Sequence, residues 1–247
     1  MSLALLNVTL PLAQFGEGSD FFQDRSNPDC VQSNGTFCFG WAADNIDRYV
    51  GPTLEHIVLV LVSVGLGFVI AMGLALLSHR RRWLITPLTG LTGVLYTIPS
   101  IAFFLLLIPI TGRGNDTAII ALTAYTLQII YRNIVSGLNN VPADVKDSGR
   151  GMGMTERQLL WKVELPMATP EIIAGLRIAT VSTVAIATLA VFAGGGGLGS
   201  EIYPDNITFK TGVIITGAIA FALAFSFDAL YLGGQRLLSP WRRAKPV

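Results

Sequence analysis

Five long apolar segments restrict what this chain can fold into. They are residues 53–78, 86–110, 117–138, 170–193 and 211–232. A helix needs roughly 20 apolar residues to cross the hydrocarbon core of a bilayer, and each segment meets that length. Charged residues make up 13% of the chain, compared with about 25% in soluble domains. We therefore predict an all-α membrane protein with about five transmembrane helices.

The positions of Lys and Arg predict how these spans are oriented. Three arginines at positions 80–82 follow the first span directly, and basic residues recur in segment 139–169 and in the tail, 239–247. Loops rich in Lys and Arg remain in the cytoplasm. Five spans then put the N-terminus outside the cell and the C-terminus in the cytoplasm. The chain divides into an extracytoplasmic segment, 1–52, a transmembrane domain, 53–238, and the basic cytoplasmic tail.

The N-terminal segment is polar and acidic. From Trp41 to Tyr49 its pattern predicts a short amphipathic helix on the membrane surface, with both aromatic rings at the level of the headgroups. The only two cysteines, Cys30 and Cys38, also lie here. A disulfide is expected if the segment faces an oxidising compartment, and a pair of free thiols is the alternative. Two cysteines are too few for a four-ligand zinc site, and no other cluster predicts a metal.

Polar and aromatic side chains interrupt the second and third spans. They are Tyr96, Thr97, Ser100, Tyr125, Gln128 and Asn133. Such residues either line a translocation path or form hydrogen bonds between helices, and both uses stay open. Pro99 removes one backbone donor and predicts a kink near the middle of the second span. In the first span, Gly65, Gly67 and Gly73 predict close packing against another helix.

One acidic residue, Asp228, lies within the fifth span. A charge inside a span is costly, so it is expected to be either functional or paired. Coupling to a proton or cation would use Asp228 as a free acid, which makes an ion-coupled secondary transporter or channel one hypothesis. An ion pair with Arg132 or Arg177, near the cytoplasmic ends of other spans, is the alternative that we favour.

The sequence shows no catalytic centre and no nucleotide site. His56 and His79 are the only histidines, and they lie at opposite ends of the first span. The glycine-rich run at 194–199 lacks the Lys-Ser or Lys-Thr that completes a phosphate-binding P-loop. We interpret this run as a flexible outer end of the fourth span. The chain is therefore expected to be no enzyme and to bind no cofactor of its own.

Between the third and fourth spans lies a stretch that is too charged to cross a membrane. Asp144 and Thr155 are predicted to cap two short helices, over about residues 145–150 and 156–163. Closely spaced glycines between them permit a sharp turn. Pro166 is predicted to end the second helix. Two short helices at an angle would form a knob that a cytoplasmic partner can bind.

This stretch resembles the EAA loop of bacterial ABC importer permeases, which reads Glu-Ala-Ala, three residues, Gly, nine residues and Ile-x-Leu-Pro. In this chain the register holds Asp147, Ser148, Gly149, Gly153, Val163, Leu165 and Pro166. All the gaps match, and the Glu-Ala-Ala element is replaced by Asp-Ser-Gly. Further segments, including Thr97-Ile98-Pro99-Ser100 and the glycine-rich run, are similar to permeases of osmoprotectant importers for glycine betaine, carnitine, choline and proline. The resemblance covers about residues 53–240.

The resemblance implies the transmembrane fold of a type I ABC importer in a bacterial or archaeal cell membrane. Such a subunit forms the translocation path with a second permease, alike or different, and receives substrate from an extracytoplasmic binding protein. Two cytoplasmic ATPases, which hold the ATP and magnesium, dock on the loops, and no nucleic acid takes part. The residues implied to contact the ATPase are Asp147, Ser148, Gly149, Met152, Gly153, Met154, Leu159, Val163, Leu165 and Pro166. Met152, Met154 and Leu159 would offer adaptable apolar contact.

Overall fold

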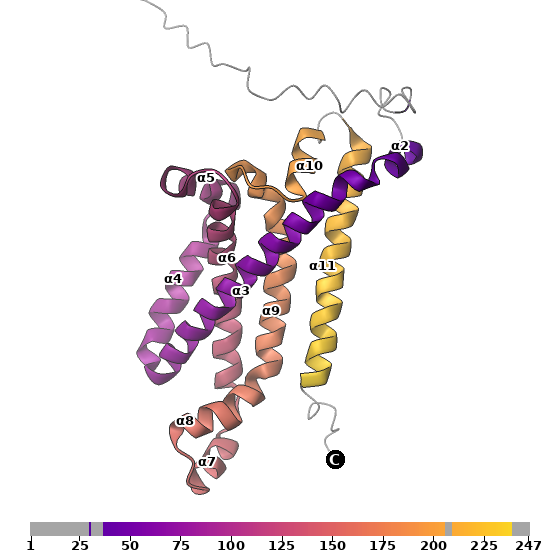
Figure 1. Cartoon of the computed structure of the whole chain (residues 1–247). Coiled ribbons are helices and arrows are strands. Elements are labelled where there is room, and N and C mark those ends of the chain that lie inside the picture. The colour runs from indigo at the N-terminus through magenta and orange to yellow at the C-terminus, as the bar shows by residue number, and fades with distance from the viewer. Residues whose placement is uncertain (1–29, 31–36, 206–208, 239–247) are drawn as a thin grey trace, which may run out of the picture.

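The computed structural model describes residue 30 and residues 37–205 and 209–238, and within these ranges all regular structure is helical (Figure 1). The predicted basic tail lies outside the described residues, as does most of the N-terminal segment. The long helices are α3 (Val50–Arg80), α4 (Ile85–Thr97), α5 (Ser100–Thr111), α6 (Asn115–Asn139), α9 (Leu165–Ala187) and α11 (Lys210–Leu238). The shorter ones are α2 (Phe39–Asp44), η1 (Ile46–Tyr49), η2 (Arg82–Leu84), α7 (Ala143–Gly151), α8 (Glu156–Leu159), η3 (Leu160–Glu164), η4 (Thr188–Ala193) and α10 (Gly199–Asp205).

Four continuous helical runs in the described part of the chain are long and apolar enough to cross a bilayer. They are Ile46–Arg80, Asn115–Asn139, Glu156–Ala193 and Lys210–Leu237. The pair α4–α5 makes a fifth crossing if it counts as one span. In Figure 1, α4 rises from the lower end of α3, and α5 turns across the top toward the start of α6. The pair therefore joins the two ends of the bundle, which agrees with about five spans.

The second span is broken where a kink was predicted. The axes of α4 and α5 differ by 97°. Ile98 is extended, and Pro99 stands at the N-cap of α5. A residue before proline avoids the α conformation, so the helix ends there instead of bending through. The hydroxyl of Tyr125, on α6, donates a hydrogen bond to the freed carbonyl of Ile98 and stabilises the break.

Helix α6 forms the centre of the bundle and packs against both α3 and α9. Its buried side chains include Leu122, Ile130, Tyr131 and Ile134, each fully enclosed. Small residues on the neighbouring helices permit this approach. A methyl group added at Gly67 of α3 would lie 1.8 Å from Thr126 Oγ1. The helices therefore touch along their backbones, as expected for packing between membrane spans.

The expectation for the other two glycines of the first span is wrong. Gly65 and Gly73 have no neighbouring atom within 4 Å of an added Cβ, so neither provides a packing face in this subunit. The second close approach comes instead from α9, where a Cβ at Gly175 would lie 2.5 Å from that of Asn133 on α6. Gly67 and Gly175 thus set how closely α3 and α9 approach α6.

Pro166 does not end a helix, contrary to the sequence prediction. The chain is helical without interruption from Glu156 to Ala193, so the fourth span is continuous with the preceding short helix. The segment Leu160–Glu164 is a π-helix, and Pro166 follows it in the first turn of α9. The wider π turn changes the hydrogen-bond register ahead of the proline, whose missing N–H and ring otherwise break a helix.

The described helices of the N-terminal segment, α2 and η1, pack on the protein instead of lying on the membrane surface. Trp41 and Tyr49 are each 1% exposed, so the predicted placement of both rings at the headgroups is wrong. Trp41 meets Phe209 edge to face, with ring centroids 4.6 Å apart. The backbone N–H of Cys38 donates to Thr211 Oγ1 at 3.0 Å. We call this contact between α2–η1 and the start of α11 the N-terminal clamp.

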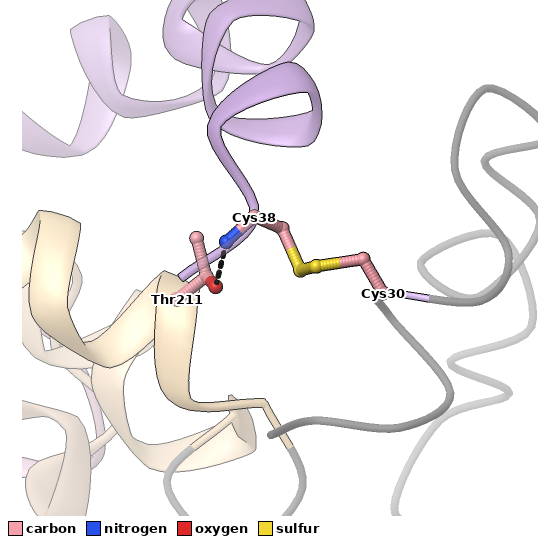
Figure 2. Close-up of a disulfide and its surroundings, with 3 residues drawn as sticks. All are labelled: Cys30, Cys38 and Thr211. Atoms are coloured by element: carbon pink, nitrogen blue, oxygen red, sulfur yellow. Dashed lines mark hydrogen bonds between the residues drawn. A yellow bond between two sulfur atoms is a disulfide. The ribbon is translucent and has the colours of Figure 1, made fainter. Parts of the chain in front are cut away.

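A disulfide and an ion pair reinforce the N-terminal clamp. Cys30 and Cys38 are bonded, with their Cα atoms 5.9 Å apart (Figure 2). Of the two states left open for these cysteines, the structure contains the disulfide. Arg48 pairs with Glu201 of α10 at 2.6 Å. The clamp therefore holds α2 and η1 against both α10 and α11.

The glycine-rich run at 194–199 is held by hydrogen bonds, so its interpretation as a flexible end is wrong. The N–H of Gly197 donates to Glu55 Oε2 at 3.1 Å, and that of Gly196 donates to Asn115 Oδ1 at 2.9 Å. His56 Nδ1 accepts from the N–H of Leu198 at 3.3 Å, which leaves Nε2 to donate to the carbonyl of Val184. A Cβ at Gly196 would lie 2.0 Å from the Glu55 carboxylate. Glycine is required here because the loop passes directly over α3.

We predict that Gly67→Val destabilises the protein whereas Gly73→Val does not. The new side chain at 67 must displace Thr126, and overpacking of this kind costs about 1–3 kcal/mol. Gly73 has open space and serves as the matched control, since both residues lie inside α3. Thermal unfolding of the detergent-solubilised protein checks this. Equal melting temperatures for the two variants would contradict the close contact of α3 with α6.

Candidate functional site

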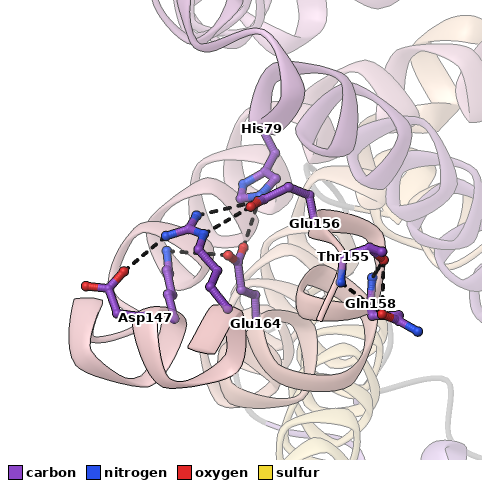
Figure 3. Close-up of polar contacts among 8 residues, drawn as sticks. His79, Asp147, Thr155, Glu156, Gln158 and Glu164 are labelled. Carbon is purple, nitrogen blue, oxygen red and sulfur yellow. Dashed lines mark hydrogen bonds and ion pairs between the residues drawn. The ribbon is translucent and has the colours of Figure 1, made fainter. Parts of the chain in front are cut away.

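The helices between α6 and α9 project from one end of the bundle (Figure 1). We call α7, α8 and η3 together the knob. Thr155 caps α8 as predicted, and it does so through a capping box. Its Oγ1 accepts from the N–H of Gln158 at 3.3 Å, and its own N–H donates to Gln158 Oε1 at 2.9 Å (Figure 3). The prediction that Asp144 caps α7 is wrong, because the N-cap is Pro142. Asp144 lies in the first turn of α7, where a carboxylate interacts favourably with the helix dipole.

The turn between α7 and α8 depends on Gly153. Its φ is +80°, in the left-handed region that glycine adopts without strain. The N–H of Gly153 donates to Arg150 O at 2.9 Å, and that of Met154 donates to Gly149 O at 3.2 Å, which closes the end of α7. Gly153 therefore allows the tight turn because it adopts a backbone conformation that other residues disfavour.

Gly149 occupies the last position of the altered Glu-Ala-Ala element for a packing reason. An added Cβ would lie 2.6 Å from Leu159 Cδ1. Leu159 is fully buried beneath α7, so it has little room to move. The two short helices of the knob are thus joined by a leucine that packs against a glycine. Leu159 cannot offer apolar contact to a partner, and that part of the prediction is wrong.

The outer face of the knob carries other candidates. Met152 is 71% exposed and Met154 is half-buried. Asp147 and Ser148 are exposed on α7, whereas Val163, Leu165 and Pro166 are half-buried where the knob joins α9. Trp161 is 56% exposed and lines a shallow groove with Arg157, Gln158 and Lys162. Trp161 was not among the residues predicted from the sequence, although an aromatic residue flanked by charged residues is typical of a contact surface.

A buried carboxylate ties the knob to the end of α3. Glu164 is 3% exposed. Its Oε2 lies 3.0 Å from His79 Nε2, and its Oε1 lies 3.8 Å from Lys146 Nζ (Figure 3). Lys146 also donates to the carbonyl of Leu138 at 3.2 Å. Glu164 therefore joins η3 to the end of α3 and to α7, and Lys146 joins α7 to the end of α6.

A second set of ion pairs crosses the outer surface of the knob. Arg150 Nε donates to Glu156 Oε1 at 3.0 Å, and its Nη1 donates to Asp147 Oδ1 at 3.2 Å (Figure 3). The hydrogen bond with Glu156 raises the pKa of Arg150 further above its ordinary value. Because these groups are exposed, the pairs contribute little to stability and chiefly orient the side chains.

Within the spans, part of the predicted path surrounds a cavity of about 440 Å³, which we call the polar cavity. Its lining consists of Tyr96, Gln128, Ile129, Arg132, Asn133, Ser136 and Ile178. Gln128 accepts a hydrogen bond from Thr92 at 2.5 Å. Tyr125 is buried behind Tyr96, with ring centroids 6.0 Å apart. Thr97 and Ser100 lie at the break between α4 and α5, away from this lining.

Asp228 and Arg177 form a two-pronged ion pair between α11 and α9. Arg177 Nη2 donates to Asp228 Oδ2 at 2.8 Å, and its Nε donates to Oδ1. Of the two partners considered for Asp228, Arg177 is the one in contact, whereas Arg132 lies on the polar cavity. The carboxylate is thus engaged by a guanidinium, which removes the free acid that an ion-coupled mechanism would need.

We predict that Asp228→Asn destabilises the protein, because it leaves the Arg177 charge unpaired inside a span. The cost should stay below the roughly 3–5 kcal/mol of a fully buried pair, since the side chains are 36% and 27% exposed. Replacing both residues by leucine should restore stability, because neither charge is then left alone. Thermal unfolding in detergent measures both effects. A double variant less stable than Asp228→Asn would contradict this account.

The chain matches a family model over residues 63–243, and the family is described as binding-protein-dependent transport system inner membrane component. It is 36% identical over 189 residues to the choline transport system permease protein OpuBB of Bacillus subtilis, covering 76% of this chain and 87% of that protein. It is 37% identical over 203 residues to the osmoprotectant import permease protein OsmW of Salmonella typhimurium, covering 80% and 94%. The carnitine transport permease protein OpuCB of Listeria monocytogenes is 39% identical over 176 residues, covering 71% and 81%.

Solved structures share the fold. A chain of the MetNI methionine ABC transporter in an inward-facing conformation superposes with a TM-score of 0.73 at 23% identity, covering 79% of this chain and 98% of that one. A chain of an amino acid ABC transporter gives a TM-score of 0.70 at 18% identity, covering 81% and 99%. The arrangement of spans and knob is therefore that of a type I importer. The chain belongs to the family of binding-protein-dependent transport system inner membrane components, the membrane permease subunits of ABC importers.

Proposed function

We propose that this chain is the permease subunit of an ATP-driven importer of quaternary ammonium osmoprotectants such as glycine betaine, choline or carnitine. The observation that carries the proposal is its 36–39% identity to three permeases named for choline, osmoprotectants and carnitine, over 71–80% of its length.

In this proposal the knob faces the cytoplasm and binds an ATPase subunit. The knob carries Lys146, Arg150, Arg157 and Lys162, and the contact of His79 with Glu164 brings the neighbouring arginines at 80–82 to the same end. Such clustering of basic residues favours a cytoplasmic location. The disulfide Cys30–Cys38 lies at the opposite end, which suits an oxidising exterior (Figures 1 and 2).

The knob would transmit force as a rigid body. The helical run Glu156–Ala193 has no break between knob and span, so a displacement of α8 moves α9 directly. Glu164 carries the same displacement to α3 through His79. Rigid-body motion of packed helices is a common way of coupling distant sites. The exposed Met152 and Trp161 are the apolar groups that we expect in the ATPase interface.

The remaining parts of the importer would come from other chains. We infer a second permease subunit, identical or related, two ATPase subunits that hold ATP and magnesium, and an extracytoplasmic binding protein that delivers substrate. This chain would perform no catalysis and hold no cofactor. Its expected surroundings are membrane lipid and these protein partners, without nucleic acid.

The proposal predicts uptake that requires ATP hydrolysis. The permease is reconstituted in liposomes with its partner subunits and binding protein, and accumulation of radiolabelled glycine betaine, carnitine and choline is measured. We expect uptake with ATP inside the liposomes and none with a non-hydrolysable analogue. Uptake that persists without hydrolysis would overturn the importer assignment, and ATP-driven uptake of none of the three solutes would overturn the substrate class.

Gly153→Asp is predicted to impair coupling while the spans still insert. An aspartate at a φ of +80° costs about 1–2 kcal/mol and shifts the turn that orients α8. ATP-driven uptake should fall at least several-fold, with a normal amount of protein in the membrane. Gly151→Asp is the matched control, because Gly151 is exposed, has open space and lacks a positive φ. Undiminished uptake by the Gly153 variant would count against the coupling role.

A further inference from the structure

The polar cavity combines a cation and an aromatic ring on one wall of the bundle. We propose that it is a cargo site within the membrane that favours quaternary ammonium compounds bearing a carboxylate over those that lack one. In this site Arg132 binds the carboxylate and Tyr96 binds the ammonium group. The inference rests on the proposed function and adds to it a selection step in the permease itself.

The contrast between two arginines carries the assignment to Arg132. Arg177 is engaged by Asp228 with two hydrogen bonds, so its guanidinium is already neutralised. Arg132 has no carboxylate partner among the residues that the structure describes, and it lines the polar cavity. An unpaired charge inside a span is costly, and a guanidinium binds a carboxylate through two parallel hydrogen bonds. A cargo carboxylate would supply the missing counter-charge.

The aromatic part of the site is fixed by its neighbours. Tyr96 is 43% exposed and lines the polar cavity, and the edge-to-face contact with Tyr125 orients its ring. Tyr125 in turn meets Phe103 with ring centroids 5.7 Å apart. An aromatic face attracts a quaternary ammonium group through the cation–π interaction. The ring of Tyr96 is therefore preoriented to bind the ammonium group of the cargo.

A second cavity adjoins the polar cavity and does not fit the same cargo. Ile178 lines both, and the second is otherwise formed by Ala174, Arg177, Val181, Ser182 and Asp228. The charges of this second cavity satisfy each other, and no aromatic residue lines it. Of these two cavities, the polar cavity is the one that combines an aromatic ring with an arginine that has no carboxylate partner among the described residues. The carboxylate and the ammonium group of a zwitterion such as glycine betaine are the chemical partners of a guanidinium and an aromatic ring.

A structural role for Arg132 in the membrane is the competing explanation. Arg132 lies seven residues before the end of α6, or about 10 Å at the helical rise, so its side chain can extend toward the headgroups. Lysine preserves that role and retains a positive charge, but it lacks the planar fork that pairs with a carboxylate. Glutamine removes the charge altogether. Comparison of the two variants on different cargoes separates lipid contact from cargo binding.

The test measures the ratio of glycine betaine uptake to choline uptake in the complete importer, with carnitine as a second carboxylate-bearing cargo. The binding protein is unchanged in all assays and is saturated with each cargo, so a change in the ratio reports the permease. We expect Arg132→Gln to lower the ratio about tenfold, the equivalent of one charge-assisted contact, and Arg132→Lys to lower it less. Tyr96→Leu should reduce uptake of all three cargoes, and Tyr96→Phe should preserve it.

The control is Arg82→Gln, which removes one exposed arginine in η2, outside the polar cavity and the knob. It should leave the ratio unchanged. An unchanged ratio in Arg132→Gln, whether or not total uptake falls, would overturn the cargo site and leave the proposed function standing. If the unaltered importer takes up none of the three cargoes with ATP, the proposed function fails and the cargo site fails with it.

Discussion

The close approach of α6 to its two neighbours is the constraint on which the rest of the structure depends. In lipid there is no hydrophobic force between apolar helices, so association relies on tight packing and hydrogen bonds. Gly67 and Gly175 allow α3 and α9 to approach α6 this closely. The broken span α4–α5 also packs along α6, and the knob follows the end of that helix. Polar groups of α6 stabilise both features, through Tyr125 at the break and through the carbonyl of Leu138, which accepts from Lys146 of the knob.

Much of the fold follows from the sequence because span length and apolarity are local properties. The long helices, the interruption at Pro99 and the cap at Thr155 are all encoded by neighbouring residues. The predictions that were wrong concern features that depend on residues beyond the immediate sequence neighbourhood. Pro166 is accommodated by a π turn, a cooperative adjustment that no single-residue rule predicts. Burial of Trp41 depends on Phe209, far along the chain, and burial of Leu159 depends on the absence of a side chain at Gly149.

The functional residues also fall into those that local sequence predicts and those that only the folded structure reveals. A motif with fixed gaps identified the knob, because the residues of the knob are contiguous in the sequence. The polar cavity has no such signature, since its lining comes from α4, α6 and α9. Composition indicated polar residues inside spans, but only the fold shows that Arg177 is paired and that Arg132 lies beside Tyr96. The same residue type thus serves as a structural group in one span and as a candidate cargo group in another.

The N-terminal clamp has a consequence for how the protein is made. Of the four continuous spanning helices, α11 has the smallest buried share, 11%, and it is held by the clamp at its start and by Asp228 further along. The partners of the clamp are separated by 173 positions in sequence, from Cys38 to Thr211. Synthesis proceeds from the N-terminus, so α2 and η1 cannot form this contact until α11 has been made. Although they precede the first span, these two helices are therefore among the last elements to reach their final positions, and their docking marks a completed subunit.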